Sequence, residues 1–256
     1  MINIKGGISI KNQRDLATMI EGGKLLSRIK KQLKKTVKVG ANASEVEEKA
    51  EKLINNIKGA TASFKMVPKY YWNTCVNVNS GLVHGIPKKE VVFKKGDLVS
   101  VDIGLYYGGF HTDSSFSVVL QPDSRTRHFF EIGEKALQKA IKAVRVGQRI
   151  YDISRAIEQE ISGANYSPIR ALVGHGVGKS LHEEPVIPCF TQGEYSDSPL
   201  ICQGMTLALE IMYAEGRPEV LLGEDGWTIS SVDGKITALF EETVAATKRG
   251  PLVLTN

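Results

Sequence analysis

Five side chains that can ligate metal ions lie in separate short apolar segments of the sequence. An ionised carboxylate is costly to bury without a partner, so acids inside such segments need a compensating charge. Four carboxylates and one imidazole suit two divalent cations, and oxygen and nitrogen ligands suit ions such as Mg, Mn, Fe, Co or Zn. A site with two cations can activate water for attack on a substrate. The five residues are Asp102, Asp113, His175, Glu210 and Glu241.

Asp102 and Asp113 lie on consecutive apolar segments joined by Tyr-Tyr-Gly-Gly. If the turn centres on Gly108 and Gly109, the two acids lie on one face of a hairpin as direct or diagonal neighbours across the strands. Two bare carboxylates at that distance repel each other and resist joint ionisation, which a divalent cation relieves. The alternative is a solvated acidic pair on an edge hairpin, and the apolar residues that flank both acids argue against it.

Two further acids occupy segments with the composition of strands. Glu210 lies in Thr-Leu-Ala-Leu-Glu-Ile-Met, which is too apolar for an acid without a role. Glu241 lies in Ile-Thr-Ala-Leu-Phe-Glu-Glu-Thr-Val. Because successive side chains of a strand point to opposite faces, Glu242 should face away from Glu241 and should not be a ligand.

The histidines also occur in patterned segments. His175 and His182 belong to Gly-His-Gly-Val-Gly-Lys-Ser-Leu-His-Glu-Glu-Pro, whose spacing differs from the HExxH helix of zinc proteases. The glycines allow close approach of a ligand, and His84 lies in a Val-His-Gly-Ile-Pro segment. His111 can support a metal ligand from behind or form a hydrogen bond in the core, and the two alternatives stay open. His128 is expected at the surface.

Composition indicates a cytoplasmic protein with a sizeable core. The chain has 256 residues, of which 42% are hydrophobic. The N-terminal segment lacks the apolar stretch of a signal peptide, and no run of residues is long enough to span a membrane. The three cysteines have no CxxC spacing, which favours reduced thiols over a disulfide framework. The sequence contains neither a nucleotide-binding loop nor a serine-hydrolase elbow.

The net charge is +5, and four lysines follow one another at helical spacing. On a helix they would form one basic stripe, which we interpret as a solvated face. Contact with a phosphate-rich partner such as ribosomal RNA is the alternative. No aromatic residues lie between the lysines, so nucleic-acid bases have no stacking platform there. The four residues are Lys31, Lys34, Lys35 and Lys38.

Helical and strand-like patterns alternate along the chain. Apolar residues at helical spacing predict a first helix that Asn12 caps, and a second that a Ser44–Glu47 capping box opens. Helices are predicted over 14–33, from Ser44 onward, over 129–144 and over 150–161. Strands are predicted over 74–78, 97–105 and 110–120.

Three sequence matches indicate an internal repeat. The segment VKVG recurs as VRVG, GDLVSVDIG parallels GMTLALEIM, and HGIP echoes HEEP. This register places Asp102 opposite Glu210. We therefore expect two α+β halves, roughly 12–120 and 121–250, which are related by a pseudo-two-fold axis and give acids to a central site. Chance similarity among helix-forming residues is the alternative.

These segments together resemble the type I methionine aminopeptidases of the pita-bread clan of metallopeptidases. The similarity covers nearly the whole chain and rests on VHGIP, GDLVSVDIG, HTDSS, GHGVGKSLHEEP, FEET and the CVNVNSGLVH stretch. It implies one α+β catalytic domain over 1–256, with a central antiparallel sheet covered by helices. It also implies a cytoplasmic monomer that removes initiator methionine from nascent proteins, with two Co, Mn, Fe or Zn ions as cofactors.

The resemblance assigns a role to each metal-ligating residue. Asp102 would hold one metal, and His175 and Glu210 would hold the other. Asp113 and Glu241 would bridge the two. Glu210 would also shuttle a proton while metal-activated water attacks the first peptide bond.

The same resemblance places other residues at the substrate. His84 and His182 would contact the substrate amide and the tetrahedral oxyanion and would not bind metal. A partly aromatic apolar slot would take the flexible thioether of methionine. The residues of this slot would be Tyr70, Cys75, Leu181 and Trp227.

Several positions depart from the family pattern. Isoleucine follows the third acid where proline is usual, and a second glutamate follows the last acid where histidine is usual. The loop before Cys75 lacks its usual glycine, tyrosine and proline, and a leucine replaces a common aromatic residue in the slot. These departures concern the shape of the pocket and the substrate range. They include Met66, Val67, Leu181, Ile211 and Glu242.

Two other functions fit parts of the pattern. An Xaa-Pro peptidase of the same clan is one, but HGIP with HEEP favours the methionine type, and we see no large extra N-terminal domain. A non-catalytic protein of the same fold that binds RNA or ribosomes through its lysines is the other. The presence of all five ligands argues against it.

Overall fold

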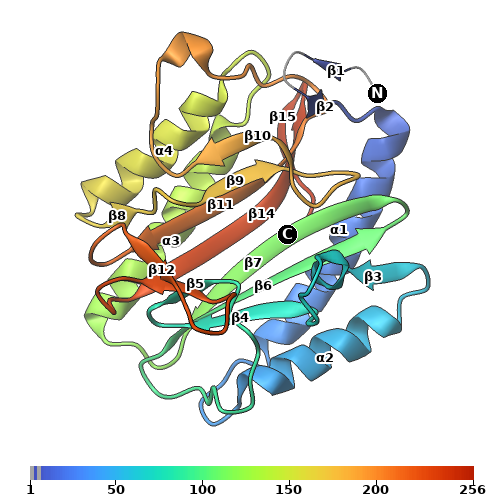
Figure 1. The fold of residues 1–256 in the computed structure, drawn as a ribbon. Helices are drawn as coiled ribbons and strands as arrows, with labels where there is room; N and C mark the ends of the chain where they lie inside the picture. The colour runs from blue at the N-terminus through green and yellow to red at the C-terminus, as the bar shows by residue number, and fades with distance from the viewer. Residues whose placement is uncertain (1–2, 5–6) are drawn as a thin grey trace.

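The computed structural model describes residues 3–4 and 7–256, and a ten-stranded sheet dominates it (Figure 1). Every strand pairing in this sheet is antiparallel. The main path runs through β10 (Glu183–Pro188), β9 (Val173–Gly176), β11 (Thr206–Ala214), β14 (Thr237–Thr247), β7 (Phe110–Val119), β6 (Leu98–Tyr107) and β3 (Ala60–Ala62). Off this path, β15 (Gly250–Val253) pairs with β14, β4 (Thr74–Val78) with β6, and β8 (Ser167–Pro168) with β11.

Short elements complete the strand structure. One small sheet pairs β1 (Asn3–Ile4) with β2 (Ile8–Ser9). Another has the order β12 (Val220–Leu222), β13 (Ile229–Ser231) and β5 (Gly81–Val83). Single 3₁₀ turns occur at Phe64–Met66 and Tyr195–Asp197.

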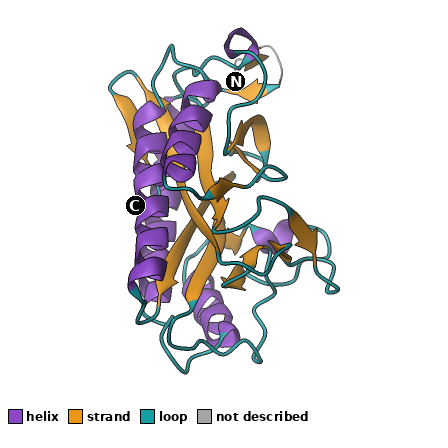
Figure 2. Ribbon diagram, turned by 90° about the vertical axis from the view of Figure 1, so that its left-hand side faces the viewer, coloured by secondary structure: helices purple, strands orange, loops and turns teal. Residues whose placement is uncertain are grey.

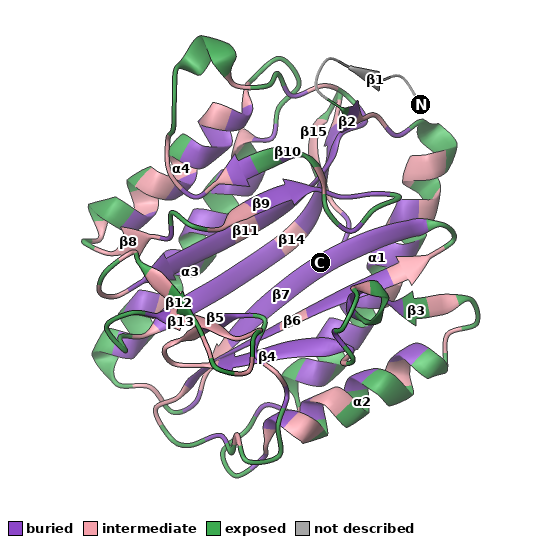
Figure 3. Ribbon diagram, in the orientation of Figure 1, coloured by how far each residue is buried: buried purple, intermediate pink, exposed green. Residues whose placement is uncertain are grey.

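The α-helices lie on one side of the large sheet, and loops and the β12–β13–β5 sheet lie on the other (Figure 2). Each helix packs an apolar stripe against the strands, so the central strands are buried along most of their length (Figure 3). In the described part of the chain, no helix combines the length and apolar composition needed to cross a membrane. The helices are α1 (Gln13–Lys34), α2 (Ala43–Asn55), α3 (Ser124–Ala143) and α4 (Ile150–Gly163).

The predicted helices and strands are confirmed, with shifts at some ends. The side chain of Asn12 caps α1 as predicted, because its Oδ1 accepts the backbone N–H groups of Arg14 and Asp15 at 2.8 and 2.9 Å. Helix α3 begins earlier than predicted. The Asp123 carboxylate caps it by accepting the N–H of Thr126 at 2.7 Å.

The predicted Ser44–Glu47 capping box is wrong. The cap of α2 is Asn42, whose Oδ1 accepts the N–H of Glu45 at 3.2 Å, while the Glu45 carboxylate accepts the N–H of Asn42 at 3.2 Å. Asparagine caps helices as well as serine does. Asn42 and Ser44 each have a glutamate three residues later, so both fit the capping-box pattern. Glu47 instead accepts the N–H of Asn73 at 2.7 Å and so ties α2 to the start of β4.

The predicted lysine stripe does not continue along one helix. Helix α1 ends at Lys34, and Lys35 is its C-cap. The chain then turns so that Val37 enters the core, which places Lys38 beyond the helix. All four lysines are exposed, as expected for a solvated face, and Lys34 also lies over the Phe116 ring at 5.4 Å.

Two glycines at matching positions of the predicted repeat have similar backbone surroundings. In the first half, the N–H of Gly40 donates to the Phe93 carbonyl at 2.9 Å, and in the second half Gly147 donates to Ile201 at 3.0 Å. Both glycines have positive φ, 87° and 90°, which a residue with a Cβ rarely adopts. The β6–β7 and β11–β14 pairs meet where β7 lies beside β14, so they occupy equivalent places about the centre of the sheet.

Two adjacent glycines of α1 should respond differently to substitution. A Cβ on Gly23 would lie 2.4 Å from the backbone oxygen of Leu254, whereas a Cβ on Gly22 would meet Tyr107 at an ordinary 3.5 Å. We expect Gly23→Ala to lower the free energy of unfolding by about 1–3 kcal/mol through overpacking. Gly22→Ala should raise it by about 0.5–1 kcal/mol through helix propensity. Urea unfolding of both variants measures this, and equal effects would contradict the packing of the C-terminus against α1.

Candidate metal centre

Strand register brings the four predicted acids to one face of the sheet. Asp102 pairs with Ser115 across β6 and β7, so Asp113 lies diagonally from Asp102, as predicted. Glu241 of β14 also pairs with Ser115, and Glu210 of β11 pairs directly with Glu241. Paired residues share a face, and residues two apart on a strand do as well. All four carboxylates therefore project to the side opposite the helices.

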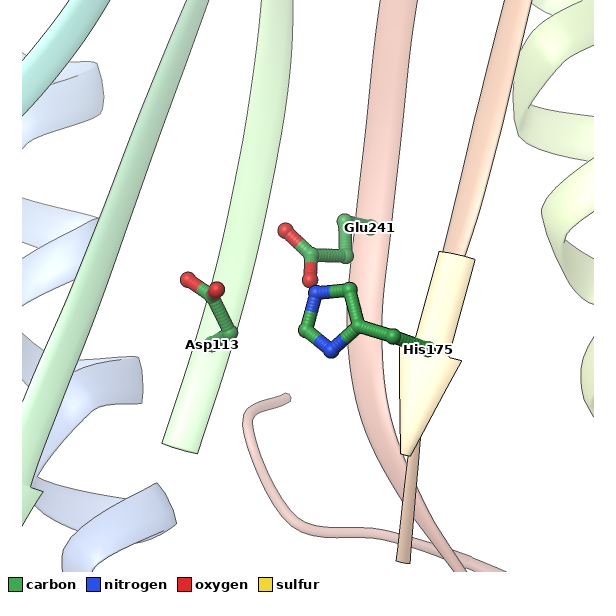
Figure 4. A group of neighbouring side chains, drawn as sticks. All are labelled: Asp113, His175 and Glu241. Carbon is green, nitrogen blue, oxygen red and sulfur yellow. The ribbon is translucent and has the colours of Figure 1, made fainter. Parts of the chain in front are cut away.

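His175 reaches the same place from β9. Its ligand nitrogen lies within 4.8 Å of carboxylate oxygens of both Asp113 and Glu241, and these three side chains converge from β9, β7 and β14 (Figure 4). Its Nε2 lies 3.4 Å from Oε1 of Glu210. Nδ1 lies 2.9 Å from the Gly176 carbonyl, which only accepts, so Nδ1 carries the proton and Nε2 offers a lone pair.

The glycines beside His175 are required by close packing. A Cβ on Gly176 would lie 2.3 Å from the backbone oxygen of Glu184, and one on Gly174 would lie 2.6 Å from that of Ala208. Only glycine allows β9 to approach both neighbours this closely. The Gly-His-Gly motif thus seats the imidazole against the acids.

The described residues supply too little positive charge to balance the negative charges of the four acids. Oδ1 of Asp102 and Oε1 of Glu241 are buried and have no hydrogen-bond partner there. Burial raises the pKa of Asp113 to about 7. Burial and the Asp113 charge together raise the pKa of Glu210 to about 8, and they raise the pKa of Glu241 well above its usual range. Burial lowers the pKa of His175 to about 4, so its imidazole is neutral. Unpaired oxygens and a neutral imidazole are the donor set that divalent cations require.

One cavity of about 260 Å³ contains the centre. All eleven residues predicted for the site line it: the five metal-ligating residues together with Tyr70, Cys75, His84, Leu181, His182 and Trp227. The sequence did not identify Phe64 and Val83 as lining residues, and it named Val67 only as a departure from the family pattern. Val83 precedes His84 and Phe64 lies in the aromatic loop before Cys75, so proximity in sequence was the available signal.

One end of the cavity is an apolar slot. Buried Phe64, Tyr70, Cys75 and Leu181 form a cluster of their own, against which Trp227 packs. The Tyr70 ring meets the Trp227 ring edge-on at 5.0 Å, and its hydroxyl donates to the Cys75 sulfur at 3.1 Å. Burial raises the pKa of the Cys75 thiol well above its usual range, so the slot presents a neutral, polarisable surface.

Two imidazoles stand at the rim of the cavity. His84 and His182 are exposed, yet both line the cavity, and the His182 ring meets the His175 ring edge-on at 4.5 Å. His84 has a φ of 58°, an uncommon conformation for a residue with a Cβ. A Cβ on the next residue, Gly85, would lie 2.3 Å from the backbone oxygen of Val76, so glycine lets this turn press against β4.

Three residues considered in the sequence lie outside the cavity. His111 is buried, lies 2.9 Å from the Ser63 hydroxyl through Nδ1 and does not line the cavity, which favours the core alternative. His128 is exposed as expected. Glu242 faces away from Glu241, as predicted, and pairs with Lys30 at 2.6 Å.

Comparison with known proteins agrees with this geometry. The profile of Metallopeptidase family M24 matches residues 17–248. Methionine aminopeptidase 1 of Bacillus subtilis is 38% identical over 97% of this chain and 99% of its own, and methionine aminopeptidase of Clostridium perfringens is 35% identical over 97% and 98%.

Solved structures agree as well. A methionine aminopeptidase from Thermotoga maritima superposes with a TM-score of 0.94 at 36% identity, covering 97% of this chain and 99% of its own. A prolidase from Pyrococcus furiosus shares the fold at a TM-score of 0.77 and 22% identity, covering 96% of this chain and 65% of its own. The fold is the pita-bread fold of these enzymes. The chain belongs to metallopeptidase family M24.

Proposed function

We propose that this chain is a metal-dependent aminopeptidase that removes the N-terminal methionine from nascent proteins when the second residue is small. One observation carries the proposal. Five ligand-type residues, an apolar slot and two rim imidazoles line a single cavity. The full-length similarity to methionine aminopeptidases supports the same activity.

Two divalent cations complete the proposed site. Asp102 would hold one, His175 and Glu210 would hold the other, and Asp113 and Glu241 would be ligands to both; Co, Mn, Fe and Zn all suit these ligands. Cations bound there lower the pKa of water and polarise a carbonyl group. The unpaired oxygens of Asp102 and Glu241 support this assignment.

The protein's own groups then move protons and orient the substrate. The Glu210 carboxylate, which lies 3.4 Å from Nε2 of His175, can take a proton from the attacking water and return it to the leaving amine. Desolvation lowers the pKa of His182, and desolvation with repulsion from His182 lowers that of His84. Both rings are therefore neutral. Each has one N–H, which it can donate to the substrate amide or to the oxyanion that forms.

The cavity selects the substrate by shape. A methionine side chain enters the slot of Phe64, Tyr70, Cys75 and Leu181, where a flexible thioether fits a partly aromatic surface. The rim imidazoles crowd the second residue, so small side chains fit and large ones clash. The proposal rests on the slot as this chain builds it, with Leu181 in place of an aromatic residue and Val67 beside it.

The cellular setting belongs to the proposal too. We place the enzyme in the cytoplasm as a monomer, and the three free thiols support a reducing compartment. The exposed lysines from Lys31 to Lys38 are solvated, and the proposal does not require them to contact the ribosome.

An Xaa-Pro peptidase is the runner-up. Prolidases share the fold, but their identity to this chain is below 25%, and the chain covers 65% or less of the prolidases compared here, including those of Pyrococcus furiosus and Pyrococcus horikoshii. The two activities differ in the side chain that occupies the slot. In this chain the slot is apolar and buried. A test with both substrate classes separates the two enzymes.

Cations should stabilise the folded protein through the acid cluster. After chelation, adding Mn²⁺ to about 100 times its Kd should raise Tm by roughly 5–10 °C, because binding relieves repulsion among buried carboxylates. Asp113→Asn removes a shared charge and should abolish most of this increase and nearly all activity. The control, Glu48→Gln, changes an exposed acid of α2 and should retain the full increase. An unaltered Mn²⁺ response in Asp113→Asn would exclude the bridging role.

His182 should contact the substrate and should not be a metal ligand. His182→Ala should lower turnover by about 10²-fold or more if it removes an oxyanion donor. Calorimetry should show unchanged metal affinity. His128→Ala, at an exposed position away from the cavity, serves as the control and should match the parent. Loss of metal binding in His182→Ala would make His182 a ligand and the assignment wrong.

Substrate choice should follow the slot and the rim. With Mn- or Co-loaded protein, Met-Ala-Ser should be cleaved quickly, and Met-Leu-Ser and Ala-Pro-Ser slowly or not at all. The first has both a thioether for the slot and a small second residue. Cleavage of Ala-Pro-Ser in preference would assign the Xaa-Pro activity. If none is cleaved while metals are bound, the catalytic proposal fails.

A further inference from the structure

A buried ion pair connects the N-terminal segment to the loop that carries His182. The Lys11 ammonium lies 2.5 Å from Oε2 of Glu183, and the two side chains are 2% and 11% exposed. These residues are 172 positions apart in sequence. Glu183 is the residue after His182, so the pair acts on the backbone that positions that imidazole.

Both oxygens of the Glu183 carboxylate are engaged. Oε2 accepts from Lys11, and Oε1 accepts the backbone N–H of Ser180 at 3.1 Å. The loop is thereby closed on itself between Ser180 and Glu183. The two residues between them, Leu181 and His182, are those of this loop that line the cavity.

The ion pair packs directly against the backbone of Gly178. A Cβ on Gly178 would lie 2.4 Å from Cε of Lys11 and 2.7 Å from Oε1 of Glu183. The Gly178 carbonyl also accepts the N–H of His111 at 2.7 Å, which anchors the start of the loop to β7. Glycine at this position makes the space that the ion pair fills.

Lys11 is itself held firmly. Its N–H donates to the Gly204 carbonyl at 2.8 Å, and the next residue, Asn12, caps α1. The backbone of Lys11 is therefore fixed, and its ammonium group in turn holds the Ser180–Glu183 loop. Lys11 forms the one ion pair of Glu183 among the described residues, and an enclosed charge that loses its partner must move or take up water, so removal of Lys11 must disturb Glu183.

We propose that Lys11 is a positioning residue for His182: through Glu183 it fixes the Ser180–Glu183 loop and so aims the His182 imidazole across the cavity rim. This inference rests on the proposed function, in which His182 contacts the reacting amide. The edge-on packing of His182 on His175 at 4.5 Å is the geometry that the pair maintains. Lys11 is buried and does not line the cavity, so it does not contact the substrate itself.

A double-mutant cycle tests the coupling. Lys11→Met keeps an unbranched side chain that is one heavy atom shorter and removes the charge. In the parent, it should lower kcat for Met-Ala-Ser by about 10-fold or more with little change in KM, because a small misplacement of a catalytic group costs up to about 10²-fold. In His182→Ala it should lower kcat no further, because the group that it positions is gone.

The matched control is Lys30→Met. Lys30 is also 5% exposed and also pairs with a glutamate, at 2.6 Å, but on the helix side of the sheet. Its effect on kcat, whatever its size, should be the same in the parent and in His182→Ala. If Lys11→Met does not fold, Glu183→Gln replaces it, since the amide oxygen can still accept the Ser180 N–H.

Proton NMR of the metal-free protein gives a second readout that does not depend on activity. The protein has five histidines, and the signal lost in His182→Ala identifies the ring. Lys11→Met should shift or broaden this signal, whereas Lys30→Met should leave it in place. An unmoved His182 signal, or equal losses of kcat in both backgrounds, would overturn the proposal. If the parent cleaves no methionine peptide, the proposed function fails, and the NMR result still decides whether Lys11 positions His182.

Discussion

Mutual repulsion among four carboxylates, two buried and two half-buried, is the constraint on which this structure depends. Asp102, Asp113, Glu210 and Glu241 lie on adjacent strands and share one face of the sheet. Nothing in the described part of the chain supplies the charge to neutralise them, since His175 beside them is neutral and Lys30 lies on the opposite face. A fold that keeps such a cluster needs cations from solution, and the antiparallel register keeps the acids close enough to share them.

The rest of the molecule serves this arrangement. Strands β6 and β7 carry two of the acids, β11 and β14 carry the other two, and the helices cover the opposite face of the sheet. The loops that carry His84, His182 and Trp227 then build the walls that the sheet does not provide. Strands and loops have different roles in the site. The regular pleat of the strands sets the spacing of the metal-ligating side chains, whereas loops can vary in sequence and so change the shape of the pocket.

Much of the site could be predicted from sequence because strand alternation and glycine turns are local. The Gly108–Gly109 turn fixed which face Asp102 and Asp113 share, and one-residue alternation separated Glu241 from Glu242. Other features depend on contacts between distant segments. Asn42 and Ser44 offer equivalent capping patterns, and only packing against the start of β4 decides between them. The Lys11–Glu183 pair joins residues 172 positions apart and has no local signal at all.

The most direct test of the account is anomalous diffraction from crystals of the protein grown with Mn²⁺. We expect two manganese peaks at the face of the sheet, with carboxylate oxygens of Asp113 and Glu241 between them, Asp102 on one ion, and His175 and Glu210 on the other. No peak at this face in crystals of active protein would contradict it, as would a single ion held by the rim imidazoles of His84 and His182.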